Sequence, residues 1–185
     1  MYQTLLRDGR FFDFLFRCDQ DLAREARRGA CPRCGGPLHQ ANYARKPRGG
    51  AIAVGSPQAL RLSFCCGREG CRRRLTPPSL RFLGRRVYLG AALILVSALR
   101  SGARSKSARE LQQSVGVSPR TLRRWRRWWQ VLLPRTPFWR AGRGRLREPI
   151  RSRDLPQALL ERFAGDRKRQ LLALLRWLTP LAGGG

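Results

Sequence analysis

The chain has 185 residues, of which 42% are hydrophobic, and its 39 lysines and arginines against 11 acidic residues give a formal net charge of +28. This length allows one compact domain or two small ones, and the apolar fraction is sufficient for real cores, which argues against wholesale disorder. Acids this few and scattered argue against a multi-carboxylate active site and hence against most enzyme classes. The positive surplus predicts a polyanionic partner, nucleic acid before acidic lipid.

The N-terminus does not have the pattern of a signal peptide, because charged and aromatic side chains alternate there without an apolar core and cleavage site. The longest apolar run, residues 87–99, has 13 residues, whereas a membrane-spanning helix needs about 20. We therefore expect a cytoplasmic, nucleoid-associated protein without membrane partners. In a reducing compartment, paired cysteines are metal ligands or free thiols rather than disulfides.

Residues 1–29 are predicted to form an N-terminal helical segment. Between residues 9 and 28 apolar side chains recur at helical spacing, and Gly29 provides a stop. The apolar stripe consists of Phe12, Leu15, Phe16, Leu22 and Ala26. Cys18 shares this stripe and is interpreted as a free core thiol.

Residues 30–76 are predicted to form a zinc ribbon, with short strands over 38–43 and 60–64 and a flexible basic loop over 44–56. Two close cysteine pairs frame this region, so that four thiolates can meet at one tetrahedral point. The predicted ligands are Cys31, Cys34, Cys66 and Cys71. Four thiolates favour Zn²⁺, and a site closed by four protein ligands is structural.

Cys65 is the alternative to Cys66 as the third ligand. We favour Cys66 because Leu62 and Phe64 share its strand parity, so the face that packs on the core also delivers the ligand. Cys65 is then a spare thiol. His39 could replace a cysteine, but is more simply a polar strand residue.

Residues 77–133 are predicted to form a helix-turn-helix domain, with helices over 86–100, 107–115 and 118–133. Ser107 and Glu110 match a capping box, Gly116 supplies a left-handed turn, and Ser118 caps the next helix. This spacing is typical of motifs that hold a second helix in the major groove of DNA.

The helix over 118–133 carries the predicted DNA contacts. Leu122, Trp125, Trp129 and Leu132 recur at helical spacing and are expected to face inward. Arginine can bond guanine bidentately or hold phosphate. We expect Arg120, Thr121 and Arg124 nearest the bases, and Ser118 and Arg127 nearer phosphates. The predicted contact set is Ser118, Arg120, Thr121, Arg123, Arg124 and Arg127.

After Pro134, residues 134–154 are interpreted as a basic linker, and residues 155–185 as a C-terminal helical hairpin with a tail. The hairpin helices are expected over 156–164 and 167–178, with Asp166 as an N-cap. Their leucine-rich face either packs on the N-terminal helix or forms a homodimer. The expected fold class is α+β, mostly α: a small zinc ribbon of antiparallel strands, a helix-turn-helix bundle and flanking terminal helices.

The order of these parts resembles the N-terminal region of insertion-sequence transposases that begin with a zinc ribbon and a helix-turn-helix. The likeness covers about residues 31–133 and rests on the segments CPRC, CRRRLTPPSLRF and SARELQQSVGVSPRTLRRW. It implies recognition of transposon-end DNA by ribbon and helix-turn-helix together. In that family a ribonuclease-H-like catalytic domain follows.

A catalytic domain of that kind is not expected here, because only 52 residues follow Leu133. Their acids lie in the predicted linker and on two helices, without strands to align them around metal ions. These acids are Glu148, Asp154, Glu161 and Asp166.

We therefore predict a protein without enzymatic activity that binds double-stranded DNA, as part of a mobile element or as a transcription regulator. The candidate protein partners are a second copy of the chain and a transposase. No small-molecule substrate is expected. The alternatives are a basic zinc-ribbon protein bound to structured RNA or the ribosome, and a non-catalytic subunit completed by a transposase.

Overall fold

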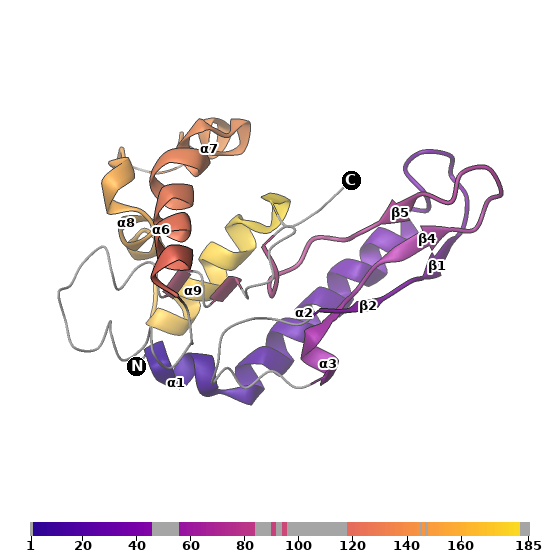
Figure 1. Ribbon diagram of the computed structural model, residues 1–185, viewed down its shortest axis with the longest axis horizontal. Coiled ribbons are helices and arrows are strands. Elements are labelled where there is room, and N and C mark those ends of the chain that lie inside the picture. The colour runs from indigo at the N-terminus through magenta and orange to yellow at the C-terminus, as the bar shows by residue number, and fades with distance from the viewer. Residues whose placement is uncertain are drawn as a thin grey trace. The chain divides into compact units, whose positions relative to one another are not determined.

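The computed structural model describes residues 2–45, 56–83, 90–91, 94–95, 118–144, 146 and 148–181 (Figure 1). The chain divides into two compact units. The ribbon unit contains residues 8–47, 53–89 and 178–185, and the helical unit contains residues 1–7, 48–52 and 90–177. Both helices and small antiparallel sheets are present, so the predicted mixed α+β class with predominant helix is confirmed.

Part of the sequence prediction falls outside the described residues. This applies to the helix over 107–115, to nearly all of the loop over 44–56, and to most of the helix over 86–100. In the predicted helix over 86–100, the described residues Ala91, Ile94 and Leu95 are helical and buried. The first helix of the predicted helix-turn-helix therefore remains a prediction.

The N-terminal segment forms two helices, α1 (Tyr2–Arg7) and α2 (Gly9–Arg28), rather than one. The break lies at Asp8, whose extended backbone and side chain cap α2, with its Oδ1 accepting the Arg10 amide at 3.0 Å. Helix α2 spans the predicted range and ends at Arg28, with Gly29 as its C-cap. Its buried row is Phe11, Phe12, Leu15, Asp19 and Ala23. This row follows i, i+4 spacing, so the remaining residues of the predicted stripe lie at its margin and are half-buried. These are Phe16, Leu22 and Ala26.

Strands β1 (Leu38–Gln40), β4 (Phe64–Cys66) and β5 (Arg74–Leu75) form one antiparallel sheet in the order β1-β4-β5. Strands β2 (Tyr43–Ala44) and β3 (Leu60–Arg61) form a second antiparallel pair, and helix α3 (Ser56–Ala59) lies directly before β3 in the chain. Figure 1 shows α2 running alongside these strands.

Each predicted ribbon strand is divided into two short strands. The first is interrupted at Ala41 and Asn42, and the second at Leu62 and Ser63. The Asn42 side chain accepts the Ser63 amide at 3.0 Å, and the Ser63 hydroxyl donates to the carbonyl of Ala41. These side-chain bonds supplement the backbone bond at the bend, from the Ala41 amide to the Ser63 carbonyl at 2.9 Å. The core beneath the sheets contains Ala23, Cys31, Leu38, Leu62, Phe64 and Cys66.

The predicted helix over 118–133 changes type along its length. Helix α6 (Pro119–Arg127) continues into a π-helical turn, η1 (Trp128–Leu132), and a 3₁₀ turn, η2 (Leu133–Arg135). The Leu133 amide bonds to the Trp128 carbonyl, five residues back, which shifts the buried row. Leu133 is therefore buried and Leu132 is 44% exposed, so the prediction that Leu132 faces inward is wrong.

The segment predicted as a basic linker, residues 134–154, contains helix α7 (Pro137–Arg143) and the 3₁₀ turn η3 (Ser152–Asp154). Thr136 caps α7 by accepting the Trp139 amide at 3.1 Å. Phe138 and Trp139 meet Trp177 edge to face, with ring centroids 4.5 and 6.0 Å apart. The predicted linker thus contributes a packed helix to the helical unit.

The packing of α7 predicts the effect of one small substitution. A Cβ added at Gly142 would lie 2.7 Å from the Trp177 ring, whereas one at Gly144 would have nothing within 4 Å. Gly142→Ala is therefore expected to lower the free energy of unfolding by about 1–3 kcal/mol, as overpacking does. Gly144→Ala is the control. Equal urea denaturation midpoints for the two variants would show that α7 does not pack on Trp177.

The C-terminal hairpin matches its prediction closely, with α8 (Gln157–Glu161) and α9 (Arg167–Trp177) inside the expected ranges and a last 3₁₀ turn, η4 (Thr179–Leu181). Asp166 caps α9 by accepting the Arg169 amide at 2.8 Å. The leucine-rich face is buried in the single chain, at Leu159, Leu160, Leu171, Leu174 and Leu175.

Candidate metal centre and nucleic-acid interface

The structure brings the four predicted ligands together. The Sγ atoms of Cys31, Cys34, Cys66 and Cys71 all lie within 4.8 Å of one another. The Sγ atoms of Cys31 and Cys71 are 3.8 Å apart, and those of Cys34 and Cys66 are 3.5 Å apart. A tetrahedron with zinc–sulfur bonds of about 2.3 Å places its sulfurs about 3.8 Å apart. The four thiols could therefore hold a metal ion, since two of their pairs lie near this spacing and all lie within 4.8 Å.

Two tight turns deliver these sulfurs. In the first, the Gly35 amide bonds to the Cys31 carbonyl at 2.8 Å, and Gly35 has a positive φ of 66°. In the second, Gly70 has a positive φ of 79°. A Cβ at Gly36 would lie 3.0 Å from the Cys66 Sγ, so only glycine lets the backbone pass this close to the sulfur without a shift.

Cys65 lies outside the cluster. Its Sγ donates to the Arg72 carbonyl at 3.3 Å, whereas Cys66 is fully buried beside the other sulfurs. The choice of Cys66 over Cys65 is thus supported by the cluster itself, whereas strand parity does not separate the two, because Arg61 and Ser63 are buried as fully as Leu62 and Phe64. His39 is exposed, pairs with Cys65 across the sheet, and is not part of the cluster.

The thiols of the cluster differ in acidity. The backbone N–H of Arg33 is the largest influence on Cys31 and, with bonds from neighbouring groups, lowers the pKa of its thiol to about 6 despite burial. At Cys66 the Arg68 amide is the largest influence and lowers the pKa. Burial and hydrogen bonds to three neighbouring cysteines outweigh it and raise the pKa to about 12. A metal ion must therefore displace protons when it binds.

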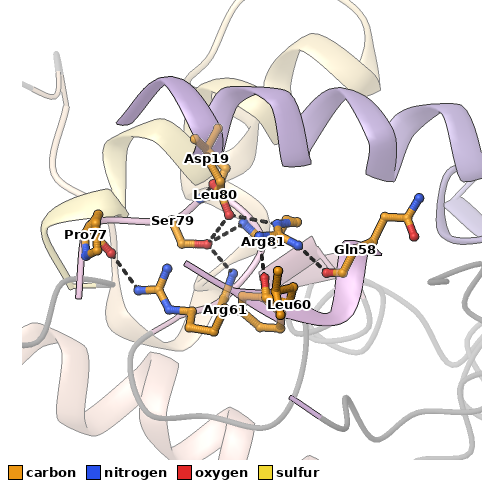
Figure 2. A network of polar contacts seen from close by, with 9 residues as sticks. Asp19, Gln58, Leu60, Arg61, Pro77, Ser79, Leu80 and Arg81 are labelled. Atoms are coloured by element: carbon orange, nitrogen blue, oxygen red, sulfur yellow. Dashed lines mark hydrogen bonds and ion pairs between the residues drawn. The ribbon is translucent and has the colours of Figure 1, made fainter. Parts of the chain in front are cut away.

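A buried ion pair that the sequence analysis missed ties α2 to the segment after the ribbon (Figure 2). The Asp19 and Arg81 side chains are 1% and 0% exposed, and Arg81 Nε donates to Asp19 Oδ2 at 2.8 Å. The Ser79 hydroxyl donates to the same oxygen at 2.5 Å, and the Leu80 amide donates to Oδ1 at 2.6 Å. Three donors thus satisfy one buried carboxylate.

The guanidinium of Arg81 extends this network to helix α3 and strand β3. It donates to the carbonyl of Gln58 and, at 2.9 Å, to that of Leu60. Nearby, buried Arg61 donates to the Pro77 carbonyl at 2.7 Å. The sequence did contain a signal for this ion pair, because Asp19 lies on the apolar stripe of the predicted N-terminal helix and a buried acid requires a partner.

Helix α6 presents the predicted nucleic-acid contacts. The Oγ of Ser118 caps the helix by accepting the Thr121 amide at 3.3 Å. Leu122 and Trp125 are 4% and 2% exposed and anchor the inner face. The other face carries five exposed arginines, four of which were predicted: Arg120, Arg123, Arg124, Arg126 and Arg127.

Two residues of α6 differ from the predicted contact set. Thr121 is 7% exposed and accepts a hydrogen bond from the Ser118 hydroxyl at 3.1 Å, so it does not belong to the exposed face. Arg126 was left out of the prediction but is exposed, and its Nε donates to Gln130 at 3.1 Å. We therefore remove Thr121 from the contacts that face solvent.

The acids of the C-terminal region have local roles. Glu148 pairs with Arg162 at 2.9 Å, Asp154 pairs with Arg151 at 2.9 Å, and Asp166 caps α9. Within the described ranges, the cysteine cluster is the one group of three or more converging metal-ligating side chains. None of the described helices is both long and apolar enough to cross a membrane.

Comparison of this chain with protein-family models, with curated proteins and with solved structures found no match.

Proposed function

We propose that this protein binds double-stranded DNA through α6 and that a structural zinc ribbon supports it. The observation that carries this proposal is the division of α6 into two faces. Leu122 and Trp125 hold one face in the core, and the five arginines on the other meet no acidic residue within the helix. A major groove about 12 Å wide admits one such helix.

Arginine side chains can carry both parts of DNA recognition. A guanidinium bonds guanine O6 and N7 bidentately, and it also binds phosphate. We assign Arg120 and Arg124, one helical turn apart, to the bases. Arg123 and Arg127, with Ser118 at the helix start, are assigned to the flanking phosphates.

Zinc is the metal that the ribbon donor set favours. Four thiolates in a tetrahedral arrangement are typical of structural zinc sites, whereas an iron centre would imply a redox role that no other feature supports. Four protein ligands leave no open position for a water nucleophile. The metal would hold the two cysteine turns together rather than act on a substrate.

A binding role without catalysis agrees with the separate local roles of the acids in the C-terminal region. In the proposed setting, the protein acts with a transposase in a mobile element or regulates transcription. In both cases it would act in the cytoplasm, at the nucleoid. Structured RNA is the competing ligand, because arginines that only hold phosphate would serve either nucleic acid.

Reversing two charges on α6 tests the proposal. The double substitution Arg120→Glu and Arg124→Glu is expected to abolish sequence preference and to weaken binding by at least about 30-fold, since each of the two lost base contacts is worth about 1–3 kcal/mol. The control reverses Arg10 and Arg17, which are exposed on α2. Nuclease footprints on a preferred site measure both. Unchanged footprints with the α6 variant would contradict the proposal, and tighter binding to ribosomal RNA than to any duplex would favour the RNA alternative.

A further inference from the structure

One side-chain amide attaches the segment around η3 to the helix that carries the proposed contacts. Gln130, in the π-helical turn η1, donates through Nε2 to the Arg153 carbonyl at 2.8 Å. Its Oε1 accepts a hydrogen bond from the Arg126 Nε at 3.1 Å. Both ends of this amide are therefore engaged, and Arg126 and the backbone of Arg153 lie on either side of it.

The attached segment is rich in exposed cations. The Arg151 and Arg153 side chains are 71% and 72% exposed, and Arg126 is also exposed. One carboxylate, Asp154, faces them, 2.9 Å from the Arg151 Nε and 3.9 Å from the Arg153 Nε. Exposed pairs of this kind are weak and leave guanidinium N–H groups available to another anion.

We infer that Arg126, Arg151 and Arg153 form a phosphate-binding surface beside α6, here called the arginine flank, and that Gln130 is its positioning residue. The partner is the sugar-phosphate backbone of the duplex that α6 enters, so this inference rests on the proposed function. Guanidinium groups match phosphate oxygens bidentately, and a phosphate can displace the weak contact with Asp154.

The flank should contribute affinity without sequence preference, because phosphate contacts position a protein on DNA but do not read bases. This separates it from Arg120 and Arg124. It also gives the flank a distinct signature, since each phosphate contact adds about 0.9 to the slope of log affinity against log salt concentration.

The experiment measures binding of the full chain to a preferred duplex, by fluorescence anisotropy over a range of salt concentrations. Arg151→Gln with Arg153→Gln is expected to lower the salt slope by about 1.8 and to weaken binding on the order of tenfold or more at 0.1 M salt. The DNA motif selected by this variant should match that of the unaltered protein. The control, Arg10→Gln with Arg17→Gln, removes the same charge from the ribbon unit and should leave the slope unchanged.

Gln130→Met tests the positioning role, because it keeps the length of the side chain and the net charge but removes both hydrogen bonds. A reduced salt slope at an unchanged denaturation midpoint supports that role, and an unchanged slope contradicts it. If the unaltered protein binds DNA and the flank variant keeps its slope, the inference fails alone. Equal slope losses in flank variant and control would also overturn it. If the unaltered protein does not bind DNA, the proposed function is wrong and the inference that rests on it is wrong as well.

Discussion

Replacing Cys66 by serine should abolish metal binding and unfold the ribbon unit, whereas replacing Cys65 should change neither. The Cys66 Sγ is buried 3.5 Å from that of Cys34, and it belongs to the cluster in which all four sulfurs converge. Structural zinc contributes about 10–16 kcal/mol of apparent binding energy, which becomes folding energy in small metal-bound units. Loss of one ligand is therefore expected to remove more stability than a small unit possesses.

The two variants form a matched pair, because Cys65 and Cys66 are adjacent in the chain but only the Cys66 side chain lies in the cysteine cluster. Elemental analysis of the purified variants gives the metal and its stoichiometry, and circular dichroism reports folding. We expect one zinc per chain in the unaltered protein and in Cys65→Ser, and none in Cys66→Ser. Metal loss from Cys65→Ser with retention in Cys66→Ser would reassign the third ligand. Another metal at full occupancy would contradict the assignment to zinc.

Asp19→Asn should destabilise the ribbon unit by about 3–5 kcal/mol, because it leaves the buried guanidinium of Arg81 without its carboxylate. Both side chains are at most 1% exposed. The control is Asp21→Asn, two residues along the same helix, whose partner Arg24 is 73% exposed. An exposed pair of that kind contributes at most about 1 kcal/mol.

Urea denaturation of the two asparagine variants measures the difference directly. A second comparison adds Arg81→Met to Asp19→Leu, which removes both charges. This double variant should recover part of the stability lost in Asp19→Asn, but not all, since the Gln58 and Leu60 carbonyls lose their donor. Equal midpoints for Asp19→Asn and Asp21→Asn would show that the buried pair does not support the unit.

The cysteine cluster could be predicted from sequence because its determinants are local. Short cysteine spacings fix each turn, and the predicted set of Cys31, Cys34, Cys66 and Cys71 is the set that converges. Helices α2, α8 and α9 were predicted for the same reason, since a helix shows its buried face and its caps within its own residues.

The features that were missed depend on partners distant in the sequence or on small changes in helix geometry. Asp19 and Arg81 are 62 residues apart, and no periodic pattern connects them. Leu132 was assigned inward on α-helical spacing, which a π-helical turn changes without any marker residue. Helix α7 did have a local signal, Thr136 followed by Pro137, but the arginines and glycines around it matched a linker composition.

The central claim, that α6 reads double-stranded DNA, is tested most directly by selection from a random duplex library with the zinc-loaded protein. Near-physiological salt and excess nonspecific competitor are required, because at low salt charge alone would retain any sequence. We predict an enriched motif containing guanines, which Arg120→Glu with Arg124→Glu no longer selects. The absence of any motif, with binding that collapses as salt rises, would contradict the claim and show that the arginines hold only phosphate.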